Sequence, residues 1–261
     1  MEPGDQITPA RAAAFWIGVG IAALALFTPM DLLGMNYMFS VHMTQHLFLS
    51  LAVPPLLIMG TPAWVYRRLF ADRRSKRGLQ FLTRPFVASI IFNGNIWLWH
   101  APLLMFLIMA QPALHLLSGL LYLLTGLIFW WPLLGTPQQQ QKPLSLGGKL
   151  AYLFFSDMPM MLLGAGLTFS RPLYSMPMGP HASMSISAGD QQLGGLLMWV
   201  VGGIFLYVVV GSSLFLKWML AQERLEQEQE EAAALEQEAS SPIETPGPSE
   251  PSRMKAEKSS A

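Results

Sequence analysis

The sequence contains no cysteine and few charged residues. Only 12% of its 261 residues are charged and 52% are hydrophobic, whereas soluble domains average about one quarter charged residues. The absence of cysteine excludes disulfides, zinc ribbons, thiolate redox chemistry and cysteine-based copper chaperone motifs. The formal net charge is zero, so no overall field favours nucleic acid as a partner. This composition predicts a membrane protein, not a soluble enzyme.

Six apolar stretches are long enough to cross a bilayer as helices, which takes about 20 residues each. We therefore predict an all-α, polytopic membrane helix bundle. The first stretch is kept as a span because no small-residue cleavage site follows it. Two adjacent prolines predict a kink in the second span. The predicted spans are residues 12–28, 37–59 (with the prolines at 54–55), 85–110, 115–134, 150–169 and 191–218.

The distribution of Lys and Arg predicts the orientation of the bundle. Fifteen of the 16 basic residues fall on one side of a six-span arrangement, and only Arg171 falls on the other. Positive loops face the cytoplasm, so we expect both termini there. We divide the chain into a cytoplasmic N-terminal segment (1–11), the transmembrane bundle (12–220) and a charged tail (221–261), helical at first and disordered from residue 240.

All five histidines fall on the extracytoplasmic side of this arrangement. His42 and His46 lie in the second span, His100 in the third, His115 at the start of the fourth and His181 in an outer loop. The spacing in HMTQH places His42 and His46 on one helix face, as two ligands of one metal would be. The alternative is that both are buried histidines that hydrogen-bond across helices. Imidazoles at membrane depth favour a functional site.

Methionine occurs 17 times, and several thioethers flank a histidine in the outer loop YSMPMGPHASM. Thioether and imidazole ligands together suit cuprous copper and exclude magnesium or calcium. The alternative is that these methionines pack the loop on the membrane interface. The candidate ligands of this loop are Met176, Met178, His181 and Met184.

Two carboxylates lie within or beside the spans. Asp157 is inside the fifth span, two residues before Pro159, and a carboxylate at membrane depth needs a partner or a proton. We expect Pro159 to bend that helix and Asp157 to be functional. Asp190 begins the sixth span, where capping of amide donors is the favoured interpretation. Asn93 and Asn95 in the third span are expected to form hydrogen bonds between helices.

Four segments then point to a family. HMTQHLFLSLAVPPLLIMGTP, WLWHAPLL, FWWPLLG and DQQLGGLLMWVVGG, in this order between residues 37 and 203, resemble the multi-pass CtaG-type cytochrome c oxidase assembly factors, which are associated with caa-type oxidases. The resemblance implies an integral plasma-membrane protein that helps cytochrome c oxidase to mature by handling copper. It also implies a second histidine one turn after His115, where this chain has Gly119. The matching positions are His42, Met43, Gln45, His46, Trp99, His100, His115, Asp190, Gln191 and Gln192.

The leading hypothesis is an oxidase assembly factor that binds cuprous copper between the second, third and fourth spans. His42, His46 and His100 are the expected ligands, His115 or a methionine such as Met43 completes the site, and the outer loop exchanges the ion with oxidase subunits. Three alternatives stay open. They are a haem-binding or electron-transfer protein with paired histidines, a transporter with Asp157 as a relay, and a metal-free scaffold for oxidase subunits.

Overall fold

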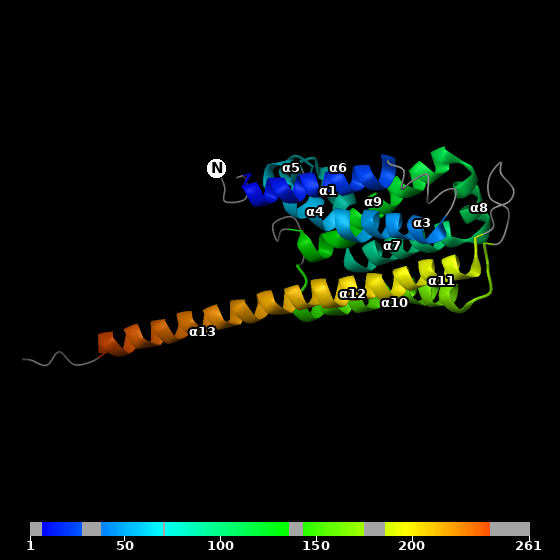
Figure 1. Cartoon of the computed structure of the whole chain (residues 1–261). Coiled ribbons are helices and arrows are strands. Elements are labelled where there is room, and N and C mark those ends of the chain that lie inside the picture. Colours follow the sequence, from blue (N-terminus) through cyan, green and yellow to red (C-terminus); the bar gives the residue numbers. More distant parts are fainter. Residues whose placement is uncertain (1–6, 28–37, 70, 136–142, 175–185, 241–261) are drawn as a thin grey trace, which may run out of the picture. The chain divides into compact units, whose positions relative to one another are not determined.

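The computed structural model describes residues 7–27, 38–69, 71–135, 143–174 and 186–240. The secondary structure in these ranges is helical (Figure 1), which confirms the all-α prediction. The chain divides into two units, residues 1–215 and 216–261, and each is described by itself. The helical segments, with π-helical turns written η, are α1 (Pro9–Phe27), α3 (Phe39–Leu47), η1 (Phe48–Ala52), α4 (Val53–Gly60), α5 (Ala63–Leu69), α6 (Arg73–Leu82), α7 (Pro85–His100), α8 (Pro102–Ala110), α9 (Pro112–Leu134), α10 (Leu146–Phe169), α11 (Ala188–Leu196), η2 (Leu197–Val201), α12 (Gly202–Ile204), η3 (Phe205–Gly211) and α13 (Ser212–Ser240).

The described residues contain five helical stretches that are long and apolar enough to cross a membrane, and α7 with α8 makes a sixth if the pair counts as one span. The second predicted span is the continuous stretch α3–η1–α4, and the first, fourth and fifth coincide with α1, α9 and α10 to within a few residues. The multi-span prediction is confirmed at this level. The side of the membrane on which each end lies stays a prediction.

The third predicted span, residues 85–110, is broken instead of straight. α8 runs at 75° to α7. Pro102 is the first residue of α8, and a proline ring disfavours the helical conformation for the residue before it. Ala101 is accordingly extended, with φ −60° and ψ 129°. His100 therefore lies at the end of a helix, where its side chain and its carbonyl both face the neighbouring helices.

A π-helical turn precedes the two prolines of the second span. Pro54 has no N–H with which to bond the carbonyl of Ser50 four residues earlier. The indole Nε1 of Trp130, on α9, donates to that carbonyl at 3.0 Å. A side chain of the fourth span thus replaces a missing backbone hydrogen bond of the second, which ties the two spans together at the level of η1.

The basic segment between the second and third predicted spans forms two short helices, α5 and α6. Asp72 precedes α6, and its carboxylate accepts hydrogen bonds from the backbone N–H groups of Arg74 and Ser75 at 2.9 and 3.1 Å. These bonds hold the pKa of the Asp72 carboxyl below its ordinary value. A charged cap therefore sets where α6 begins.

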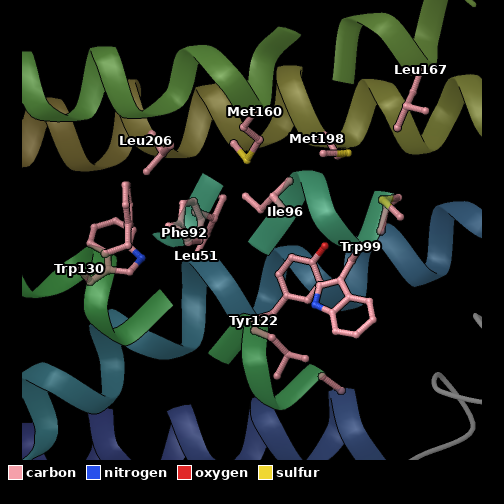
Figure 2. Close-up of a cluster of buried hydrophobic side chains, with 14 of the residues drawn as sticks. Leu51, Phe92, Ile96, Trp99, Tyr122, Trp130, Met160, Leu167, Met198 and Leu206 are labelled. Carbon is pink, nitrogen blue, oxygen red and sulfur yellow. The ribbon is translucent and has the colours of Figure 1, made fainter. Parts of the chain in front are cut away.

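Glycines allow several helices to approach closely. A Cβ on Gly195 of α11 would lie 2.7 Å from the carbonyl oxygen of Gly164 in α10, and one on Gly126 of α9 would lie 2.9 Å from that of Ser50. Close backbone contact of this kind stabilises helix pairs in membranes. Large apolar side chains fill the remaining interior, as Figure 2 shows for Phe92 and its neighbours.

The second unit contains the C-terminal part of α13. Every side chain from residue 216 to residue 236 is exposed within this unit, and the sequence changes there from apolar to Glu-rich. The helical character predicted for residues 223–238 is confirmed. The segment predicted to be disordered begins at residue 240, but Ser240 is the last residue of α13, and the rest of the segment lies outside the described residues.

Candidate functional site

Four of the five histidines come together in the interior of the first unit. His42 and His46 project from α3, His100 from the end of α7 and His115 from the first turns of α9. Each is at most 5% exposed. They meet because the start of α3, the end of α7 and the start of α9 lie at the same end of the bundle. The predicted convergence of these four residues is therefore observed.

Three of these rings form a hydrogen-bonded chain. His42 is its centre, with its Nδ1 atom 3.0 Å from Nε2 of His115 and its Nε2 atom 2.8 Å from Nε2 of His46. The rings of His42 and His46 are 4.1 Å apart between centroids, as their i, i+4 spacing predicts. We call these three residues the imidazole chain. Each link joins two imidazole rings, and no carboxylate takes part in either link.

The imidazole chain does not converge on one point, because His42 directs its two nitrogens at different partners. Among the described residues, no group of three or more His, Asp or Glu is arranged to hold a metal ion. Two nitrogens that each lie about 2.0 Å from one tetrahedral ion are about 3.3 Å apart, further than the 2.8 Å between His42 and His46. A metal that entered this link would therefore push the two rings apart.

His100 makes a different set of contacts beside the chain. Its Nδ1 atom lies 2.7 Å from the carbonyl oxygen of Ile96, and its Nε2 atom lies 3.3 Å from the sulfur of Met43. Its own carbonyl accepts a hydrogen bond from the Tyr174 hydroxyl at 2.8 Å. Burial raises the pKa of the Tyr174 hydroxyl, so this donor stays protonated. Contacts at both ring nitrogens thus fix the orientation of the His100 ring.

A cavity of about 20 Å³ lies between the imidazoles and three thioethers. Figure 2 shows Met160 and Met198 on one side of the surrounding cluster, facing the side on which Ile96 and Tyr122 lie. Sequence reasoning did not assign Met160 and Met198 to the site, since nothing in the sequence sets them apart from the other methionines. The side chains with polar or sulfur atoms that line it include His46, His100, Tyr122, Met43, Met160 and Met198.

The two acidic residues have separate roles. Asp190 accepts hydrogen bonds from the backbone N–H groups of Phe39 and Ser40, at 3.1 Å for Ser40. The expectation that Asp190 caps the start of the sixth span is wrong, because Ser187 caps α11. Asp190 instead accepts hydrogen bonds at the start of α3, which carries His42 and His46. Asp190 therefore fixes the start of the helix that holds two of the four imidazoles.

Asp157 lies elsewhere in the interior, on α10. It is 1% exposed, and neither carboxyl oxygen has a hydrogen-bond partner among the described residues. The nearby Tyr207 donates its hydroxyl to the carbonyl of Phe154 at 3.4 Å. α10 continues through Pro159 as one helix. The expected carboxyl at membrane depth is present, and its function stays a prediction.

Several other predicted residues hold helices together. Asn93 donates to the carbonyl of Ser156 at 2.9 Å, and Asn95 contacts Thr125 at 3.3 Å, which confirms the expected bonds between helices. Gln191 accepts from the N–H of Leu173 at 2.7 Å. Gln192 is exposed. The outer-loop candidates Met176, Met178, His181 and Met184 lie outside the described residues.

Residues 1–221 match the family model for the cytochrome c oxidase caa3 assembly factors. The chain belongs to this family. Among curated proteins, it is 24% identical over 243 residues to uncharacterized proteins of Mycobacterium bovis and Mycobacterium tuberculosis. The match covers 84% of this chain and 34% of each relative, so the chain spans about a third of their length. A protein of Mycobacterium leprae is 25% identical over 207 residues, which is 72% of this chain and 31% of the relative.

No solved structure matches this member of the assembly-factor family. The structure does explain one departure from the family resemblance. Gly119 lies one turn after His115, but a Cβ there would be 2.7 Å from a methyl carbon of Leu26 on α1. A larger side chain at this position would require the Leu26 side chain to move. Among the described residues, the imidazoles are those of His42 and His46 on α3, His100 on α7 and His115 on α9.

Proposed function

We propose that this protein assists the maturation of cytochrome c oxidase by binding cuprous copper at the buried histidine cluster and passing it to oxidase subunits. The observation that carries the proposal is the convergence of His42, His46, His100 and His115 from three helices, all at most 5% exposed. Imidazoles at membrane depth that meet in one place favour a functional site over scattered structural bonds. Membership of the oxidase assembly family supports cytochrome c oxidase as the enzyme whose maturation is assisted.

The ligand chemistry supports copper over harder ions. The groups within contact of the cluster are imidazole nitrogens, a thioether and a phenol, and the chain has no thiol. Nitrogen and thioether donors suit cuprous copper, whereas magnesium and calcium require oxygen ligands. Neutral donors also suit a monovalent ion, because burial of extra charge in an apolar interior is costly.

The geometry favours copper over haem. Haem needs a pocket of several hundred Å³, whereas the cavity beside His46 and His100 has a volume of about 20 Å³. The imidazole chain leaves no gap for a macrocycle, since its links are 2.8 and 3.0 Å long. A copper ion needs only a small displacement of the rings.

The distribution of charge supports delivery on the extracytoplasmic side. The basic helices α5 and α6 lie at the end of the bundle opposite the histidines, and the positive-inside rule assigns that end to the cytoplasm. In this arrangement the copper site faces the outer surface of the plasma membrane. Met176, Met178, His181 and Met184 would then exchange the ion with the oxidase.

Titration of the purified protein with cuprous ion, in competition with a chromophoric cuprous chelator, tests the proposal. We expect His42→Ala/His46→Ala to weaken copper binding at least about tenfold, in the range seen when a metal site loses supporting groups. Gln192→Ala, at an exposed position, is the matched control and should bind as the wild type does. Wild-type affinity and stoichiometry in the double variant would contradict the proposal, and circular dichroism would verify that its helices are intact.

A further inference from the structure

We propose that the 20 Å³ cavity between α3, α7, α10 and η2 is a thioether–imidazole site for a soft monovalent metal ion, with His100, Met43, Met160 and Met198 as its ligands. This site shares His100 with the histidine cluster and borders His46, which can supply a further nitrogen ligand. The inference deepens the proposed function, on which it rests, because it names the atoms that would hold the cuprous ion. Two of these residues, Met160 and Met198, come from helices that carry no histidine of the cluster.

The first argument is the orientation of the His100 ring. The carbonyl oxygen of Ile96 only accepts hydrogen bonds, so the Nδ1 atom 2.7 Å from it carries the proton. In the neutral ring Nε2 then has a free lone pair, and it faces the sulfur of Met43 at 3.3 Å. A thioether is also only an acceptor. Two acceptors thus face each other with no hydrogen between them.

A proton on Nε2 would relieve this contact only at a high cost. It would make His100 a buried cation, and the contacts of its ring nitrogens in the described part of the chain are a carbonyl, a thioether and a phenol, with no carboxylate. Charges without a counter-ion are expensive at membrane depth. A soft metal ion relieves the same contact through bonds to both atoms, and its charge is shared among several donors. The facing acceptors are therefore best explained as ligands.

The distance between the two donors fits one ion. An ion about 2.0 Å from an imidazole nitrogen and about 2.3 Å from a sulfur separates the two donors by at most about 4.3 Å. The observed 3.3 Å corresponds to a bent arrangement around the ion, which leaves further positions for other ligands. The His42–His46 link, at 2.8 Å, is more compressed. His100 and Met43 can thus bind an ion without moving their helices.

Two more thioethers form the opposite wall of the cavity. Met160 and Met198 are 2% and 4% exposed, and both line it. Met160 has room because Gly202 has no side chain, since a Cβ there would lie 3.0 Å from the methyl carbon of Met160. Met198 belongs to η2, and π-helical turns within helices often mark functional sites. The cavity has the size for a bare ion and the donors that a soft ion prefers.

The cavity also touches the imidazole chain. His46 lines it, and the buried Nδ1 atom of His46 has no hydrogen-bond partner within the described part of the chain. An ion in the cavity therefore lies next to one end of the chain formed by His46, His42 and His115. This places an exchangeable nitrogen donor beside the thioether site, so that an ion can change ligands without entering water.

X-ray absorption of the full-length protein in mild detergent, loaded with cuprous or silver(I) ion, tests the inference. We expect one ion per chain with both sulfur and nitrogen scatterers. Met160→Leu/Met198→Leu conserves volume and should lose sulfur scattering and at least about tenfold in affinity. Met105→Leu/Met109→Leu is the matched control, because these methionines are equally buried and lie outside the cavity. Zinc(II) should not displace the ion.

The outcomes separate this inference from the proposed function. Nitrogen-only coordination, or a cavity variant that binds like its control, overturns the thioether site and leaves copper binding by the histidines. A sulfur-ligated ion that survives in the cavity, combined with normal oxidase assembly in cells that lack the protein, supports the site and overturns the assembly role. Failure of the wild type to bind either ion overturns both.

Discussion

Among single residues, Asp190 and Asp157 show how differently two buried or half-buried carboxylates can be used. Asp190 accepts two backbone N–H bonds at the start of α3, and bonds of this kind stabilise a helix terminus. Asp157 accepts none, although it is more deeply buried. An unpartnered carboxyl at such a position reduces stability. Asp190 therefore stabilises the fold, whereas Asp157 lowers its stability.

Substitution of the two aspartates should accordingly have unequal effects. We expect Asp190→Ala to lower the free energy of unfolding by about 1–2 kcal/mol, because α3 loses its cap. Asp157→Asn should leave stability within about 0.5 kcal/mol of the wild type or raise it. Unfolding in mild detergent, followed by circular dichroism, measures both. Equal losses in the two variants would mean that Asp157 has a stabilising partner.

At the scale of helices, the prolines determine where the spans depart from regular geometry. Pro102 turns the chain by 75° directly after His100, and Pro54 frees the carbonyl of Ser50. In both places a neighbouring helix or segment supplies the missing hydrogen bond, from Tyr174 to His100 and from Trp130 to Ser50. The irregular turns are thus held by side chains distant in sequence.

The bond between Trp130 and Ser50 gives a prediction at this scale. Trp130→Phe keeps an aromatic ring in the core but removes the only donor of that side chain. The buried carbonyl of Ser50 then lacks a partner, which costs about 1–3 kcal/mol. We expect a matching loss in the free energy of unfolding in detergent. Trp16→Phe is the control, because Trp16 is 68% exposed and should change stability less.

At the scale of the whole molecule, the arrangement places the histidine end and the basic end at opposite ends of the first unit. The absence of cysteine makes the orientation directly testable. We expect Ala188→Cys, beside the start of α11, to react with a membrane-impermeant maleimide in intact cells. Gly78→Cys, in α6 with open space around it, should react only after the cells are permeabilised. The reverse pattern would place the histidines at the cytoplasmic surface.

The sequence was sufficient to locate most of the spans and to pair His42 with His46, because hydropathy and i, i+4 spacing are local properties. That His100 and His115 lie near them was inferred from the predicted side of each histidine, not from local spacing. The break after His100 also had a local signal in the proline two residues later. Met160 and Met198 could not be assigned, since their place in the cavity depends on packing among α7, α10 and η2. The partner of Asp190 was missed for the same reason, as it lies 150 residues away in sequence.

The donors proposed for the metal carry no negative charge, and this has an electrical consequence. A cuprous ion that enters displaces no proton from a neutral imidazole lone pair or a thioether, so each loading event adds one full positive charge to a region of low dielectric. Loading and release would therefore move a charge through part of the transmembrane potential. Moving one elementary charge across the whole membrane changes its free energy by about 2.3 kcal/mol per 100 mV. Copper occupancy should then respond to the voltage that the mature respiratory chain itself generates.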